Sequence, residues 1–260
     1  MNIFRASTFA AAALFCALLV PSPSTAQENA PAKARNAVLV HGAFADGSSW
    51  SEVIPLLQAA GLQVTSVQNP LSSFKDDVDI TRRILAQQDG PTVLAGHSYA
   101  GMVISETGVA PKVTALVYVA ARAPDAGEDY PALAGKFPPA PAGKGIVRAD
   151  GFVQLSEEAF IRDFAGDLPP AKARALYAVQ GRISETLFAS RTTQAAWRSK
   201  PSFYAISRND RTTSPELQRF VAERMKATTI ELESSHVSLI SHPREIADLI
   251  LQAAGYAKTQ

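Results

Sequence analysis

Short apolar runs alternate with segments of helical periodicity over much of the chain. The apolar runs are NAVLVHG, LQVTSVQ, PTVLAG and KVTALVYVAA. The segments that follow the first three runs, SSWSEVIPLLQAAG, KDDVDITRRILAQQDG and AGMVISETG, have the spacing of helices. Strands that alternate with helices predict a parallel sheet covered by helices on both faces, which also accounts for the nearly continuous apolar strands.

The alternation is interrupted between about Arg122 and Lys200. This segment begins with the stretch PDAGEDYPALAGKFPPAPAGKG, whose proline and glycine content predicts a loop, and continues with short helical patterns. The alternation then returns with PSFYAIS, SPELQRFVAERM, TTIELE and HPREIADLILQAAG. We therefore predict an α/β fold, a mostly parallel doubly wound sheet, with a helical cap inserted at about residues 122–200.

The N-terminal segment has a different composition. A basic start, MNIFR, precedes the apolar run ASTFAAAALFCALLV, and the prolines of PSPSTAQ lead to a small-residue site that ends at Ala26. This pattern predicts an export signal at residues 1–26, a flexible lead-in at 27–35 and a globular domain at 36–260 in the periplasm or the medium. A membrane anchor is the alternative, but the run is shorter than the ~20 residues of a spanning helix.

Composition narrows the classes of function. The chain has 25 basic and 24 acidic residues, so its charge does not indicate a nucleic-acid partner. The single cysteine, Cys16, lies in the predicted signal, which leaves the exported domain without a thiol. The four histidines are scattered, and neither a phosphate-binding loop nor a dinucleotide motif is present. We therefore expect a small-molecule partner, no cofactor, no metal, and no membrane span once the signal is removed.

One serine stands at a sharp corner of the predicted fold. In VLAGHSYAGM, Ser98 follows an apolar strand and precedes a helix, and Gly96, Ala100 and Gly101 keep its surroundings small. Such a strand–serine–helix turn exposes the hydroxyl, and the helix N-terminus points toward the same place. Ala100 replaces the second glycine of the usual G-x-S-x-G motif. We interpret Ser98 as a nucleophile; a serine that only caps the helix is the alternative.

A nucleophilic serine needs a base and an acid that orients the base. Asp210 follows the strand PSFYAIS, and His236 follows the strand TTIELE. Both positions lie at the carboxyl edge of a parallel sheet, where catalytic groups gather, and the chain order serine, acid, histidine is that of hydrolases. We predict the triad Ser98, Asp210 and His236. Asp125 is the competing acid, and His242 more simply begins the last helix.

The loop after the first strand suits an oxyanion hole. An acyl-transfer transition state places negative charge on an oxygen, which rigid backbone N–H groups stabilise. The sequence HGAF has no side chain at Gly42, so its backbone can approach a ligand closely. We assign the donors to the N–H groups of Ala43 and Tyr99, with Phe44 as the alternative to Ala43. His41 is interpreted as ordering this loop.

Five motifs together resemble a known family: HGAFADGSSW, GHSYAG, ALVYVAARAPDAGE, SRNDRTTSPELQ and ESSHVSLISHP. They are similar to the serine α/β-hydrolases, in particular to the group of bacterial esterases, plant methyl esterases and plant hydroxynitrile lyases, over about residues 36–255. The resemblance implies the same three triad residues. The lyases carry a threonine and a lysine at the positions of Gly42 and Val237, so the resemblance implies hydrolysis here.

We therefore expect a carboxylic ester hydrolase that acts on small or medium apolar or aryl esters through an acyl-enzyme. The alternatives are a carbon–carbon bond hydrolase, a hydroxynitrile lyase-like enzyme, or a non-catalytic binder of the same fold. Phe44, Phe152, Phe160 and Trp197 are the predicted pocket residues. Further aromatic candidates from the insertion are Phe137, Phe164, Tyr177 and Phe188.

Overall fold

The computed structural model describes residues 1, 3 and 33–256. Most of the predicted signal peptide at 1–26 and of the lead-in at 27–35 falls outside these residues. The chain divides into two units, residues 1–30 and 31–260, and the second contains all the elements described below. In the described part of the chain, no helix has the length and apolarity needed to span a membrane.

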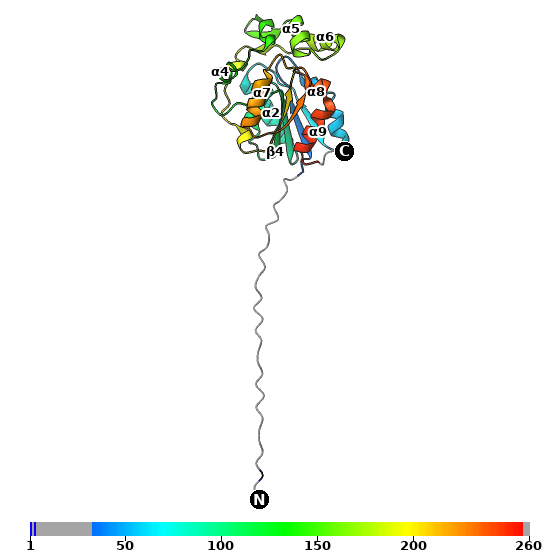
Figure 1. Ribbon diagram of the computed structural model, residues 1–260, viewed down its shortest axis with the longest axis vertical. Helices are drawn as coiled ribbons and strands as arrows, with labels where there is room; N and C mark the ends of the chain where they lie inside the picture. Colours follow the sequence, from blue (N-terminus) through cyan, green and yellow to red (C-terminus); the bar gives the residue numbers. More distant parts are fainter. Residues whose placement is uncertain (2, 4–32, 257–260) are drawn as a thin grey trace. The chain divides into compact units, whose positions relative to one another are not determined.

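A six-stranded parallel sheet forms the centre of this unit, in the order β2-β1-β3-β4-β8-β9 (Figure 1). Its inner strands are the most apolar ones, and every residue of β1 and β3 is buried. The strands are β1 (Asn36–Val40), β2 (Gln63–Val67), β3 (Thr92–His97), β4 (Val113–Val119), β8 (Ser202–Ser207) and β9 (Thr228–Leu232). The predicted parallel sheet is confirmed.

Helices cover both faces of the sheet. The helices of the core are α1 (Ile54–Ala59), α2 (Phe74–Gln87), α3 (Ala100–Thr107), α7 (Pro215–Arg224), α8 (Ser238–Ser241) and α9 (Pro243–Ala253), with a 3-10 turn, η1 (Gly47–Trp50), before α1. α1 packs against α9, whereas α2 packs against α3. Figure 1 shows α2 and α7 on one side of the sheet and α9 on the other, so the sheet is doubly wound.

Sequence-encoded caps define where several of these helices begin. The Ser73 side chain accepts a hydrogen bond from the backbone N–H of Asp76 at the start of α2. Ser214 does the same for Leu217 at the start of α7, where Pro215 occupies the first helical turn. These caps satisfy N–H groups that have no partner inside the helix, which fixes the helix starts next to the strand ends.

The segment between β4 and β8 forms the cap. Its helical elements are α4 (Tyr130–Ala134), η2 (Pro141–Gly145), α5 (Glu157–Ala159), the π-helix η3 (Phe160–Phe164), α6 (Pro170–Ala178), η4 (Leu187–Ala189) and η5 (Ala196–Arg198). Short helical elements follow the predicted loop, as expected, but α4 and η2 lie within the stretch predicted to be loop.

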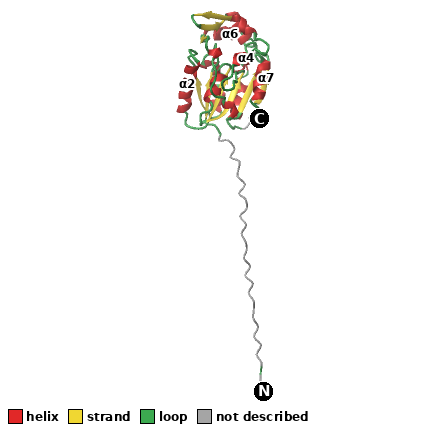
Figure 2. Ribbon diagram, turned by 90° about the vertical axis from the view of Figure 1, so that its left-hand side faces the viewer, coloured by secondary structure: helices red, strands yellow, loops and turns green. Residues whose placement is uncertain are grey.

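The cap also contains a three-stranded antiparallel sheet that the sequence analysis did not predict. Its strands, β5 (Ile146–Ala149), β6 (Phe152–Leu155) and β7 (Ile183–Ser184), are drawn above the main sheet in Figure 2. Asp150 and Gly151 form the β5–β6 turn with φ values of 52° and 76°. A dipeptide of aspartate and glycine is a strong hairpin signal, so this turn was detectable in the sequence.

Candidate active site

Ser98 occupies the turn between β3 and α3 in a left-handed backbone conformation, with φ of 55°. Its N–H donates to the carbonyl oxygen of Val119 at 3.0 Å, and its carbonyl oxygen accepts from Gly101 at 3.1 Å and from Arg122 at 3.0 Å. A non-glycine residue adopts this conformation only when its surroundings hold it there. The three hydrogen bonds therefore fix the serine at the carboxyl end of the sheet.

The turn has space for small residues only. A methyl group built at Gly42 would lie 2.8 Å from Cβ of Ser98, and one at Gly101 would lie 1.8 Å from the carbonyl oxygen of Arg122. Both glycines are therefore required by close approach of the backbone. The side chain of Ala100, which replaces the usual glycine, is completely buried as the first residue of α3, so the turn accommodates its methyl group.

The structure brings Ser98, His236 and Asp210 into one hydrogen-bonded line. Nε2 of His236 lies 2.7 Å from Oγ of Ser98, and Nδ1 lies 2.7 Å from Oδ2 of Asp210. The side chains of His236 and Asp210 are fully buried. An ionised carboxylate can only accept, so Nδ1–H donates to Asp210 and Nε2 is left to accept the serine proton.

The carboxylate of Asp210 accepts hydrogen bonds at both oxygens. Oδ1 accepts from the backbone N–H groups of Thr212 at 2.7 Å and Thr213 at 2.9 Å. Oδ2 accepts from Nε2 of Gln218 at 2.7 Å in addition to the histidine. These donors hold the carboxylate in one orientation, which in turn fixes the ring of His236.

Gln218 is a site residue that the sequence analysis missed. It lies on α7 with no exposed surface, and its Oε1 accepts from the N–H of Ser207 at 3.0 Å. Its amide also donates to the carbonyl oxygen of Thr213 at 3.0 Å. The only signal in the sequence is a glutamine on the inward face of an amphipathic helix, which does not reveal its partner.

Two further histidines are buried near the line and order the backbone. Nε2–H of His97 donates to the carbonyl oxygen of His236 at 2.9 Å. Nδ1–H of His41 donates to the carbonyl oxygen of Gly42 at 2.8 Å, and its Nε2 accepts from the N–H of Asn69 at 2.9 Å. Burial lowers the pKa of both His41 and His97, so both remain neutral.

A cavity of about 250 Å³ opens next to Ser98 and is called the serine cavity below. Its lining comes from the loop after β1, the turn between β3 and α3, the cap and the segment after β8. It is lined by Ala43, Phe44, Ser98, Tyr99, Arg122, Pro131, Ala142, Gly143, Ile146, Leu155, Phe188, Thr212 and Thr213. The cap therefore forms much of the wall opposite the serine.

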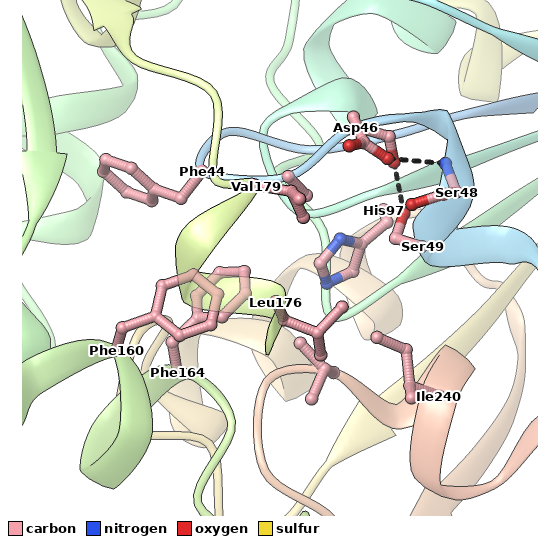
Figure 3. Close-up of a pocket in the computed structure, with 12 residues that line it drawn as sticks. Phe44, Asp46, Ser48, Ser49, His97, Phe160, Phe164, Leu176, Val179 and Ile240 are labelled. Carbon is pink, nitrogen blue, oxygen red and sulfur yellow. Dashed lines mark hydrogen bonds between the residues drawn. The ribbon is translucent and has the colours of Figure 1, made fainter. Parts of the chain in front are cut away.

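A second, narrow cavity of about 20 Å³ lies beside His97 (Figure 3). Its walls include Phe160 and Phe164, whose ring centres are 4.7 Å apart, and Leu176 of α6. Phe44, with φ of 61°, lines both this space and the serine cavity. The narrow cavity has room for about one water molecule, so the serine cavity is the candidate substrate site.

Comparison with known proteins agrees with this architecture. The model of a family described as "Alpha/beta hydrolase family" matches residues 37–249. The chain belongs to this family. The matched segment contains all three residues of the hydrogen-bonded line, and it spans the cap.

Several characterised proteins are similar to this alpha/beta hydrolase. The alpha/beta hydrolase nvfD of Aspergillus novofumigatus is 26% identical over 85% of the chain and 96% of its own length. A carbendazim-hydrolyzing esterase of Nocardioides is 34% identical over 40% of the chain and 49% of its own length. Methylesterase 8 of Arabidopsis thaliana is 25% identical over 84% and 88%. The relatives are hydrolases and esterases, and this protein is a carboxylesterase-like hydrolase.

Solved structures share the fold. The crystal structure of polyneuridine aldehyde esterase aligns with a TM-score of 0.72 and 20% identity over 85% of the chain and 99% of its own. A pyrethroid hydrolase from Sphingobium faniae aligns with a TM-score of 0.71 and 23% identity over 85% and 98%. At these identities the likeness supports the fold of the alpha/beta hydrolase.

The predicted pocket residues of the hydrolase divide into two groups. Phe44 lines both cavities and Phe160 lines the narrow one. Phe152 and Trp197 line neither, which corrects that prediction. Phe152 lies on β6 with 40% of its surface exposed, because the unpredicted hairpin turns it outward. Trp197, in η5 of the cap, is buried, and its Nε1–H donates to the carbonyl oxygen of Pro124 at 2.8 Å.

The other aromatic candidates divide in the same way. Phe188 lines the serine cavity and Phe164 lines the narrow one. Tyr177 packs on Phe160 with ring centres 5.8 Å apart, and Phe137 packs on Phe220 at 5.4 Å. Aromatic composition alone could not separate the residues that line a cavity from those that hold the cap together.

The competing candidates for the triad have other partners in this hydrolase. The carboxylate of Asp125 accepts from Nε of Arg198 at 2.8 Å and is part of a surface ion pair. His242 precedes α9, with its Nδ1 at 3.4 Å from a carboxylate oxygen of Glu245. Neither contacts the line through His236. Among residues 1, 3 and 33–256, no group of three or more histidine, cysteine, aspartate or glutamate side chains could hold a metal ion.

A buried carboxylate supports the residue that follows the serine. The hydroxyl of Tyr99 donates to Oδ2 of Asp77 at 2.9 Å, and the N–H of Leu71 donates to Oδ1 at 2.9 Å. Burial raises the pKa of Asp77 to about 6, and the two hydrogen bonds oppose that shift only partly. The sequence placed Asp77 only in the first turn of a helix, so its link to Tyr99 was missed.

Proposed function

We propose that this hydrolase cleaves carboxylic esters through an acyl-enzyme formed on Ser98. The observation that carries the proposal is the buried line from Asp210 through His236 to Oγ of Ser98, with 2.7 Å at each link. A serine hydroxyl becomes a competent nucleophile only when a base of this kind removes its proton. The names of the relatives, several of which are esterases, support the same chemistry.

In the first half of the reaction, Nε2 of His236 takes the proton of Ser98 while Oγ attacks the ester carbonyl carbon. Asp210 stabilises the imidazolium that forms and holds its tautomer. The tetrahedral intermediate then collapses, the carbon–oxygen bond of the ester breaks, and the alcohol leaves with the proton from His236. In the second half, His236 activates water, which releases the acid and restores Ser98.

The negative oxygen of the intermediate needs two donors. We assign them to the backbone N–H groups of Ala43 and Tyr99, with Phe44 as the alternative to Ala43. All three residues line the serine cavity beside Ser98. In the described part of the chain, the N–H groups of Ala43 and Tyr99 donate to no protein acceptor, so both are available to a ligand.

The size and lining of the serine cavity suit a small or medium ester. Its volume of about 250 Å³ and its apolar walls from Phe44, Ile146, Leu155 and Phe188 favour short acyl or aryl groups. Val237, directly after the histidine, is buried and apolar, so it offers no cation to bind cyanide. This residue favours hydrolysis over cyanohydrin cleavage.

We also propose that the enzyme works outside the cytoplasm, in the periplasm or the medium, with residues 1–26 as a cleaved signal. The basic start, the apolar run and the small residues before Gln27 support this. Expression of the full chain followed by N-terminal sequencing of the exported protein tests it. Cleavage after Ala26 is the expected result, and a protein that stays in the cytoplasm with Met1 intact contradicts it.

The catalytic proposal is tested by labelling and by turnover. A fluorophosphonate should label the purified protein at Ser98, and Ser98→Ala should abolish the label. The same variant should lower kcat for 4-nitrophenyl acetate more than about a thousandfold, because removal of a triad nucleophile has effects of that size. Near-normal turnover by a folded Ser98→Ala protein would refute the proposal.

A further inference from the structure

The serine cavity contains a cation that has no acidic partner. Nη1 of Arg122 donates to the carbonyl oxygen of Phe188 at 3.2 Å and lies 3.6 Å from Sδ of Met102. The guanidinium carbon also lies 4.8 Å from the ring centre of Phe188 and 5.4 Å from that of Tyr130. Within residues 33–256, no carboxylate pairs with this guanidinium, and its Nε and Nη2 donate to no protein acceptor.

Two other arginines have carboxylate partners: Arg224, which donates to the carbonyl oxygen of Ala123, and Arg211, which precedes the cavity residue Thr212. Nη1 of Arg224 lies 2.7 Å from Glu128, and Nε of Arg211 lies 2.6 Å from Asp163. Withdrawing a charge from water without a counter-charge is unfavourable, so an unpaired partly buried arginine needs an explanation. Burial lowers the pKa of Arg122, as expected for a cation whose charge no carboxylate offsets. The guanidinium nevertheless remains protonated.

The backbone of Arg122 is hydrogen-bonded to the backbone of Ser98. Its backbone N–H donates to the carbonyl oxygen of Ser98 at 3.0 Å. Arg122 lines the serine cavity and also a cavity of about 190 Å³, and Thr212 and Thr213 belong to both linings. Neither lining includes an aspartate or a glutamate among the described residues. A ligand that reaches Ser98 therefore meets one positive charge and no negative charge.

We propose that Arg122 binds the carboxylate of an ester substrate that carries a free acid group. The substrate class is a monoester of a dicarboxylic acid, or an ester whose alcohol part bears a carboxylate. Nε and Nη2 provide the parallel pair of donors that carboxylates prefer. The proposal rests on the proposed ester hydrolysis and names the substrate class of that same site.

Pairs of esters that differ only in the acid group test the idea on either side of the ester bond. For the acyl side, 4-nitrophenyl hydrogen adipate is compared with 4-nitrophenyl hexanoate. For the alcohol side, 4-acetoxybenzoic acid is compared with its methyl ester. The readout is the ratio of kcat/KM for the acidic ester to kcat/KM for the neutral one, which cancels any loss that both esters share.

Arg122→Gln should lower this ratio about tenfold to a hundredfold for at least one pair, because a charge-assisted hydrogen bond is removed. Arg122→Lys should restore part of the ratio, since it keeps the charge but not the paired donors. The control Arg148→Gln removes a charge from an exposed position on β5 and should leave the ratio unchanged. Equal ratios for wild type and Arg122→Gln in both pairs would overturn the proposal.

A binding measurement separates this inference from the catalytic proposal. Monoethyl adipate and 4-acetoxybenzoic acid are titrated calorimetrically into Ser98→Ala and into Ser98→Ala/Arg122→Gln. Binding of either compound that weakens about tenfold or more in the double variant supports the anion site even if the protein hydrolyses no ester. Equal affinity of both proteins for each compound, or no binding to Ser98→Ala, overturns the anion site even if Ser98 proves to be the nucleophile.

Discussion

The carboxyl edge of the main sheet and the cap face the same cavity but are built differently. At the sheet edge, the residues of the hydrogen-bonded line are held by several contacts: Ser98 by three backbone hydrogen bonds and Asp210 by four donors. The cap consists of short elements, and its Val147, Phe152 and Val179 are exposed. The difference teaches that contacts within the core fix the positions of Ser98 and Asp210, whereas the shape of the serine cavity depends also on the cap.

The largest expected difference between the core and the cap is the effect on stability of adding one methyl group to a glycine. Gly101→Ala should lower the free energy of unfolding by at least about 3 kcal/mol, because its Cβ would lie 1.8 Å from the backbone oxygen of Arg122. Gly143→Ala in the cap has nothing within 4 Å of the added atom and should change stability by less than about 0.5 kcal/mol. Urea unfolding of both variants measures the difference, and similar midpoints would refute the contrast.

A smaller effect is expected from replacing Gln218, whose amide donates a hydrogen bond to the carboxylate of Asp210. Gln218→Met keeps the side-chain volume but removes a donor to Asp210 and the acceptor for the N–H of Ser207. We expect kcat to fall about tenfold to a hundredfold. KM should change less, because Gln218 does not line the serine cavity.

Steady-state kinetics on 4-nitrophenyl acetate measure this effect, with Gln58→Met as the matched control on the exposed side of α1. Circular dichroism establishes that both variants are folded. A kcat of Gln218→Met equal to that of the control would show that the remaining donors to Asp210 are sufficient.

The smallest expected effect is a pH dependence of stability that arises from Asp77, whose carboxylate accepts a hydrogen bond from Tyr99. Burial raises the pKa of Asp77 from 3.8 to about 6, so the folded state favours the protonated form. This group contributes stability that is fully present below pH 3.8 and is lost as pH rises through about 6. Between about pH 5 and pH 7.5, the wild type should lose about 1 kcal/mol relative to Asp77→Asn, which cannot ionise.

Urea unfolding at the two pH values checks this prediction. Asp76→Asn is the control, because Asp76 is exposed and hydrogen bonds from Ser73 and Ser72 lower its pKa. Its effect on stability should therefore stay constant across this pH range. A wild type that loses no stability relative to Asp77→Asn would show that Tyr99 and Leu71 compensate the buried charge.

The core was predictable because its signals are local or follow from topology. Apolar runs define the strands, and small residues around Ser98 define the turn. Since parallel strands end at one edge, the positions of Asp210 and His236 after β8 and β9 were enough to expect that they meet. The distances of 2.7 Å agree with that expectation.

The residues that were missed depend on contacts between distant segments. Gln218 and Asp77 are ordinary helix residues in the sequence, and only packing reveals their bonds to Asp210 and Tyr99. Arg122 marked only the boundary of the insertion, because nothing in one sequence shows that a charge lacks a partner. In the cap, short strands gave weak periodicity, so the turn at Asp150 was the one available signal of the antiparallel sheet.

The hydrogen bond from His97 to the carbonyl oxygen of His236 has a consequence for redesign. His97 is the chain neighbour of Ser98, so this hydrogen bond joins the segments that carry Ser98 and His236 without using any atom of the cap. The cap nevertheless holds the chain neighbour of His236, because the N–H of Ser235 donates to Oδ2 of Asp167 at 3.0 Å. Exchanging the cap for that of a relative should thus alter which compounds enter, and the spacing between the Ser98 hydroxyl and the His236 imidazole should be kept only if the replacement supplies an acceptor for Ser235.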